Sequence, residues 1–135
     1  MSALSITAAN VQPASNAVIL SGTFGATITA GQVVYELSSD NEWYLADADV
    51  LATSVVAGIA INGGSDGQAG DIQIVGDIDL GATLTVGQIY VLSTTAGGIA
   101  PTVDTASGDY VTVLGVATAA DSMMMGILIS NTAEP

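Results

Sequence analysis

Short stretches of alternating apolar and polar residues recur along the chain and predict β-strands. Residues 71–74 read DIQI and residues 77–80 read DIDL, so every second side chain is apolar. Near the end of the chain, Ile127 and Ile129 flank Leu128. A period of two is typical of strands with one buried face and one solvated face.

Glycine-rich segments separate these stretches. The chain has 16 Gly, several of them in NGGSDGQAGD (62–71) and TTAGGIAP (94–101). Turn residues at such short spacing are typical of hairpin-rich proteins. The sequence therefore predicts an all-β fold.

An internal repeat divides the chain into two similar halves. ATITAGQVVYELSS (26–39) returns 56 positions later as ATLTVGQIYVLST (82–94), and each copy continues to a second similar element, VVAGIAI (55–61) and VTVLGVAT (111–118). Two copies are too few for a solenoid. We predict a small β-barrel or sandwich with pseudo-twofold symmetry, whose halves span about 26–80 and 82–132.

The first copy has one extra residue when its Tyr35 is aligned with Tyr90. An insertion in a period-two strand must be absorbed locally, or every later side chain changes face. The alignment predicts a β-bulge near Val33 or Val34.

Residues 1–16 lie outside the repeat and carry no charged side chain. We predict an extended N-terminal arm here, followed by the barrel-like domain at 17–135. Such an arm can add a strand to a neighbouring sheet, and simple disorder is the competing interpretation. If the arm binds a partner, Leu4, Ile6 and Val11 are its candidate contacts.

The charge composition removes many functions. The chain has 13 acidic residues and no Lys, Arg, His or Cys, which gives a formal charge of −13. Side-chain bases, nucleophiles and phosphate clamps are drawn largely from the missing types, so we expect no enzyme activity. Nucleic acid is a poor partner, because binding it relies on Lys and Arg. A basic protein surface is a better one.

Neither a membrane span nor a signal peptide is expected. No apolar run approaches the roughly 18 to 20 residues of a span, and the N-terminus lacks the positive region and apolar core of a signal peptide. We therefore expect synthesis in the cytoplasm and no membrane partner.

The segment from Ala46 to Ser130 resembles small bacteriophage virion proteins, in particular head decoration or capsid cement proteins. The run GQIYVLSTTAGGIAP followed by GDYVTVLGVA carries most of the resemblance. Similar strings also occur in modules of phage tail fibres and other appendages. The total lack of basic residues is a departure from such proteins.

The resemblance implies a small β-barrel or β-tulip that sits on the outer surface of the capsid, often as a homotrimer, and reinforces contacts between major capsid subunits. It therefore implies the major capsid protein as partner, the virion as location and the host cytoplasm as the place of synthesis. A tail-fibre or appendage module involved in host recognition is the alternative function.

Carboxylates close in sequence are candidates for cation binding. Calcium prefers oxygen ligands of this kind, yet NGGSDGQAGD (62–71) matches neither an EF-hand loop nor the nonapeptide of calcium-binding β-rolls, and solvated surface carboxylates are the competing interpretation. A paired-carboxylate glycosidase lacks any Arg or His to orient a substrate. We expect no cofactor, with calcium as the one candidate. The residues concerned are Asp40, Glu42, Asp47, Asp49, Asp66, Asp71, Asp77 and Asp79.

Two further side chains are candidate partner contacts. Trp43 precedes Tyr44, so in a strand the two rings face opposite ways, and capping the barrel competes with a partner contact for the tryptophan. Met124 lies in a run of three Met, a side chain that adapts to irregular surfaces, although packing in the core or at its rim is the competing role.

Overall fold

The computed structural model describes residues 3–135, and its regular structure consists of β-strands joined by turns and three short 3-10 helices. The prediction of an all-β fold is confirmed. The strands are β1 (Val11–Pro13), β2 (Val18–Thr23), β3 (Val33–Leu37), β4 (Glu42–Leu45), β5 (Val56–Ala60), β6 (Ala69–Leu80), β7 (Ile89–Leu92), β8 (Ile99–Pro101), β9 (Tyr110–Ala117) and β10 (Ser122–Ala133), and the 3-10 helices are η1 (Ala8–Asn10), η2 (Leu51–Thr53) and η3 (Thr102–Asp104).

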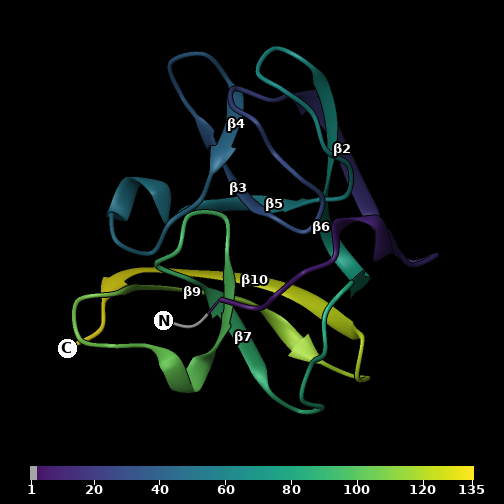
Figure 1. Cartoon of the computed structure of the whole chain (residues 1–135). Helices are drawn as coiled ribbons and strands as arrows, with labels where there is room; N and C mark the ends of the chain where they lie inside the picture. Colours follow the sequence, from purple (N-terminus) through teal and green to yellow (C-terminus); the bar gives the residue numbers. More distant parts are fainter. Residues whose placement is uncertain (1–2) are drawn as a thin grey trace.

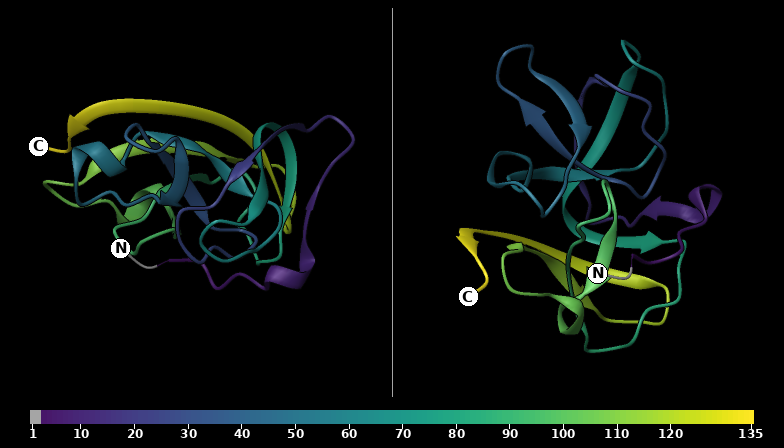
Figure 2. Two further views of the ribbon diagram at one scale, coloured as in Figure 1. Left: turned by 90° about the horizontal axis from the view of Figure 1, so that it is seen from above. Right: turned by 60° about the vertical axis from the view of Figure 1, so that its left-hand side comes forward.

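The sheet is built from the same four-stranded unit used twice. Its main path runs β4, β3, β5, β6, β10, β9, β7, β8, while β1 and β2 pair with β6 beside this path. Reading outward from the β6–β10 pair gives β5, β3, β4 on one side and β9, β7, β8 on the other. The sheet curls into a half-barrel (Figures 1 and 2). The prediction of two half-chain repeats is therefore confirmed at the level of strand topology.

Strand β6 joins the two halves by changing partners along its length. Its first part pairs with β2 and β5, and its last part pairs with β1 and β10. The change falls at Gly76, whose φ of 97° favours glycine. A Cβ atom there would lie 2.6 Å from the Asn16 carbonyl oxygen, so the backbone also needs the space.

Equivalent hydrogen bonds support the same turn in both repeats. Gly31 and Gly87 have φ values of 93° and 85°, and their N–H groups donate to the carbonyls of Ala60 and Ala117, each at 2.8 Å. This is the physical reason why the sequence repeats the glycine, because only glycine adopts that conformation without strain.

The ladder of the first copy shifts register between Val34 and Tyr35, beside the predicted bulge, but β3 does not carry the extra residue. In the structure Val34 lies opposite Gly58, and Tyr90 lies opposite Gly115, so Val34 is the residue equivalent to Tyr90. The register shift falls instead on the neighbouring strands: Ala57 in β5 and Leu114 in β9 have no partner in their ladders. Both repeats contain the irregularity, and aligning the two tyrosines concealed it.

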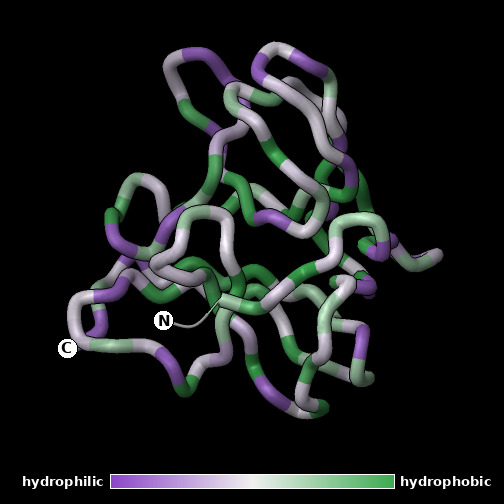
Figure 3. The backbone as a smooth tube through the Cα atoms, in the orientation of Figure 1, coloured by the Kyte–Doolittle hydropathy of each residue, from purple (hydrophilic) through white to green (hydrophobic). Residues whose placement is uncertain are grey.

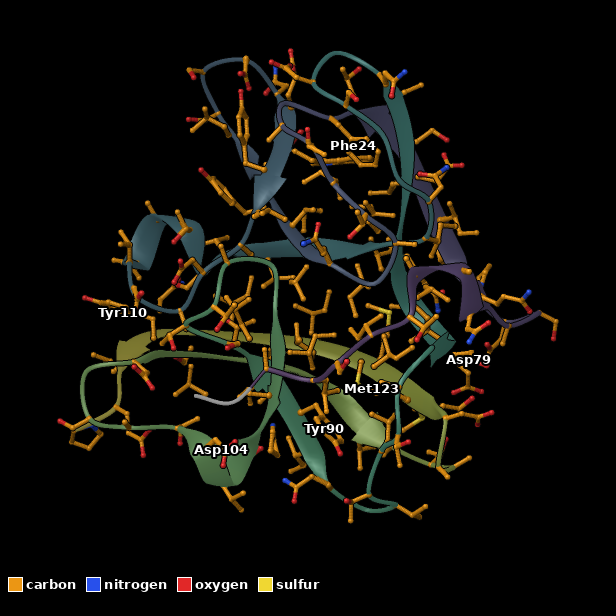
Figure 4. All side chains as sticks on the ribbon, viewed as in Figure 1. Phe24, Asp79, Tyr90, Asp104, Tyr110 and Met123 are labelled. Carbon is orange, nitrogen blue, oxygen red and sulfur yellow. The ribbon has the colours of Figure 1, made fainter. Side chains whose placement is uncertain are left out.

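Two hydrophobic clusters hold the fold together. The larger one lies between the two halves and takes Val33 and Ile59 from the first repeat together with Tyr90 and Met123 from the second. The smaller one surrounds Phe24 within the first repeat. In Figure 3 the apolar segments concentrate toward the middle of the molecule, and Figure 4 shows Phe24 in the upper half and Met123 in the lower half.

The described part of the predicted arm lies along its own chain. The Leu4 N–H donates to the Ile99 carbonyl at 2.7 Å, and β1 pairs with the end of β6, with Val11 opposite Leu80. The side chain of Ile6 packs closely over Gly31. These residues thus cover the core of their own barrel, and the strand that the arm was expected to add to a neighbouring sheet is added within the chain. Residues 1–2 of the predicted arm lie outside the described residues.

Candidate interaction surfaces

The five side chains predicted to contact a partner fall into three environments. Val11 is 6% exposed and Trp43 is 5% exposed, so their own chain already covers both. Leu4 and Ile6 are half-buried against the larger core cluster. Met124 is 50% exposed. Val11 and Trp43 thus have little surface left for a partner, whereas Met124 remains available.

Trp43 is a core residue because its ring fills the space beside a glycine. It packs in the smaller cluster with its ring centroid 6.1 Å from that of Phe24. A Cβ atom on Gly22 would lie 2.8 Å from the indole ring. Alternation along β4 then turns Tyr44 to the other side, where its ring lies 6.1 Å from that of Tyr35.

The outer side of β7, β9 and β10 carries exposed apolar side chains, and we call it the β10 face. Ile89, Val116 and Met124 lie directly opposite one another in neighbouring strands and therefore share a side of the sheet. In a second row Leu128, which is 67% exposed, lies opposite Val113. Together with Gly126, four of these side chains line a shallow hollow of about 220 Å³.

A second apolar surface runs along β2. Val18, Ile19 and Leu20 are all exposed, and Val75 beside them on β6 is exposed as well. Among the described strands, β2 pairs with β6 alone, so its other edge has no strand partner. Natural sheets usually protect such edges with charge or coverage, which this strand lacks.

The carboxylates around β4 do not form one site. Tyr44 donates a 2.6 Å hydrogen bond to Asp40, which lowers the pKa of Asp40 and raises that of Tyr44 to about 12. Asp49 responds to other neighbours: repulsion from Asp47, burial and then Asp109 raise its pKa. The predicted cluster is therefore split into a hydrogen-bonded pair and a repelling group.

The carboxylates of the glycine-rich loop serve its turn and the adjoining strands. Asp71 accepts hydrogen bonds from the Ser21 hydroxyl at 2.6 Å and from the Asn62 amide at 3.4 Å. Asp66 is exposed at the loop tip. Within residues 3–135, no three His, Cys, Asp or Glu side chains gather closely enough to hold a metal ion.

Asp77 and Asp79 share one side of β6. Asp77 lies opposite Met124 and Asp79 lies opposite Ser122, so both carboxylates border the β10 face. Asp79 also lines a polar cleft of about 540 Å³ with Asp121 and polar residues of the arm. The predicted pair thus has regular strand geometry, at the boundary between an apolar surface and an acidic one.

The sequence reasoning missed Gln73. Alternation with Ile72 and Ile74 predicts a solvated side chain, yet Gln73 is fully buried. Its amide donates to the carbonyls of Asp77 at 2.8 Å and Val75 at 3.2 Å, beside the point where β6 changes partners, and its Oε1 accepts no hydrogen bond. No local pattern signals this role, because both faces of β6 are covered only after the second half packs against the first.

Among the described residues, no helix is long and apolar enough to span a bilayer. Comparison of the sequence with known protein families finds no matching family, and comparison with curated proteins finds no match either.

Proposed function

We propose that the chain is a bacteriophage virion structural protein that binds the outer surface of the assembled capsid and stabilises it. The observation that carries the proposal is the combination of uncovered apolar strand surfaces with a surface charge of one sign. Such a chain is suited to be covered by a differently charged protein surface. The resemblance of residues 46–130 to decoration proteins supports the same reading.

In this proposal the partner is the major capsid protein, and the protein acts by contact, without a reaction or a cofactor. Burial of apolar side chains supplies most of the binding free energy. Binding to the assembled shell alone stabilises it by mass action, by an amount set by free concentration over Kd. A homotrimer, as in the proteins that it resembles, would give each copy several contacts on one shell.

Two measurements test the function. The first is the copy number in purified virions by quantitative mass spectrometry after digestion with chymotrypsin, because trypsin has no site in a chain without Lys or Arg. Hundreds of copies are expected for a protein spread over the head. The second compares the thermal stability of shells with and without the protein. Equal stability would contradict the stabilising role, and absence from virions would contradict the virion role.

One structural feature favours the alternative function of a tail-fibre or appendage module. The β3–β4 hairpin projects at one end of the molecule (Figure 1) and carries the half-buried Tyr35 and Tyr44 beside the exposed Asp40. Aromatic rings next to carboxylates can bind sugars. A few to a few dozen copies per virion, together with affinity for host glycans that Tyr44→Ala removes, would favour this module over the decoration protein.

A further inference from the structure

We propose that the β10 face is the docking face of this protein and that it receives an apolar side chain of another protein flanked by Lys or Arg. Under the proposed function that protein is the capsid subunit, so the choice of partner rests on the proposed function. The location of the face rests on three independent observations: the internal repeat, a glycine and the charges at the border.

The repeat shows what this side of the sheet becomes when it is covered. Val33, Ile59 and Gln73 form a row across β3, β5 and β6, and in strand register they match Ile89, Val116 and Met124. The first row is fully buried between the two halves. In the matching row of the second repeat, Ile89 and Met124 are exposed. The second repeat therefore has the same apolar face without the cover that the first one has.

Gly126 leaves room on this face that the fold does not need. A Cβ atom there would meet nothing within 4 Å, and the residue does not have a positive φ. Glycine inside a strand destabilises it by roughly 0.5–1 kcal/mol relative to alanine and often marks close approach of a ligand or another backbone. The hollow beside Gly126 is thus suited to an incoming side chain.

The border of the face determines the charge of the partner. Asp77 lies in the same row as Met124, and Asp79 lies beside it along β6. The chain has no Lys, Arg or His, so the only charged side chains that a second copy could place there are further carboxylates. Complementary charge must come from a different chain, whose basic side chains would speed association and lower affinity at high salt.

Two variants test the docking face. Gly126→Val extends a branched side chain into the hollow from a Cβ position with no neighbour within 4 Å, and Met124→Ser removes an exposed apolar side chain. The matched control is Val50→Ser, because Val50 is 53% exposed and lies outside the rows of side chains that form the β10 face. The probe is empty heads that lack this protein, prepared from the phage that encodes it, and the readout is the amount of protein that sediments with them. Unfolding midpoints verify that each variant is folded.

We expect Gly126→Val and Met124→Ser each to weaken binding about tenfold or more, as for a central anchor, and Val50→Ser to bind like the wild type. Asp77→Asn should reduce the dependence of binding on salt, whereas Asp66→Asn, at the distant loop tip, should not.

Each outcome has a separate meaning. If the wild type binds heads and both face variants bind equally well, the docking face is wrong and the proposed function stands. If the folded wild type does not bind heads, the proposed function and the capsid partner fail together. If the wild type self-associates and Gly126→Val abolishes only that, the occupant is a second copy and the inferred basic partner is wrong.

Discussion

Gln73 and Met124 occupy the same position in the two repeats, opposite Ile59 and Val116 respectively, yet Gln73 is fully buried and Met124 is half exposed. The difference arises because the halves do not pack symmetrically. The first unit turns Val33 and Ile59 toward the second, whereas the second turns Tyr90 and Met123 toward the first. The two units therefore pack through non-equivalent faces of their sheets. The face of the second unit that is equivalent to the buried face of the first stays uncovered, and it is the β10 face.

Substitution of two glycines should separate a packing requirement from a free surface. A Cβ atom on Gly115 would lie 2.2 Å from the Met124 carbonyl oxygen, a backbone atom that cannot move aside cheaply, whereas one on Gly126 would meet nothing. We expect Gly115→Ala to lower the free energy of unfolding by about 1–3 kcal/mol. Gly126→Ala should raise it by about 0.5–1 kcal/mol. Urea denaturation measures both.

The repeat supplies a control for this pair. Gly58 is the counterpart of Gly115, and its Cβ position lies 2.6 Å from the Gln73 carbonyl oxygen. Gly58→Ala should therefore destabilise in the same way. A stable Gly58→Ala protein with wild-type unfolding would contradict the equivalence of the two strands.

Gln73 should tolerate neither a charge nor the loss of its amide. Gln73→Glu places carboxylate oxygens where an amide now donates to the Asp77 and Val75 carbonyls. Burial raises the pKa of such a carboxyl, so the variant should be most stable at acid pH and lose stability as the pH rises. At neutral pH we expect a loss of at least about 2 kcal/mol in urea denaturation.

The matched comparison for Gln73→Glu is Gln73→Met, because methionine stands at the equivalent position, 124, of the second repeat. Gln73→Met removes the donor and also the unpartnered Oε1. Its destabilisation should be smaller and independent of pH. If Gln73→Glu proved as stable as Gln73→Met at neutral pH, the amide would not hold the carbonyls at the point where β6 changes partners.

The repeat and the strands could be predicted from the sequence because each depends on local chemistry. Gly31 and Gly87 mark a turn that needs positive φ, and alternation marks strands. The contacts between the two halves have no comparable signal in the local sequence. Gln73 looks solvated and Val11 looks free in the sequence, and the structure buries both. The exposed β2 edge was also missed, since an apolar strand predicts burial whether or not a neighbour covers it.

The pKa of Tyr44 should depend on its hydrogen bond to Asp40. The hydrogen bond to Asp40 raises the pKa of Tyr44 to about 12, so its contribution to stability is present below the ordinary value of 10.0 and is lost as the pH rises through the folded value. Tyrosinate absorbance should show one tyrosine that ionises near pH 12, and Asp40→Asn should bring its pKa back toward 10.0. A titration unchanged by Asp40→Asn would contradict the bond.

Charge repulsion should be the contribution to the free energy of folding that responds most to salt and pH. With a formal charge of −13 and no cation to offset it, the melting temperature should rise with added salt as screening shortens the range of repulsion. Asp49 contributes, because Asp47 and Asp109 raise its pKa. A raised pKa in the folded state means that this carboxyl opposes folding above 3.8 and ceases to do so as the pH falls below it.

Asp49→Asn should therefore raise the melting temperature at neutral pH and low salt, with the gain shrinking both at high salt and in acid. The control is Asp66→Asn, which removes the same formal charge from an exposed loop tip. Removing any charge lowers the overall repulsion, so the two variants share that part of the gain. The excess for Asp49 over Asp66 measures the local repulsion from Asp47 and Asp109, and equal gains would show that only the net charge matters.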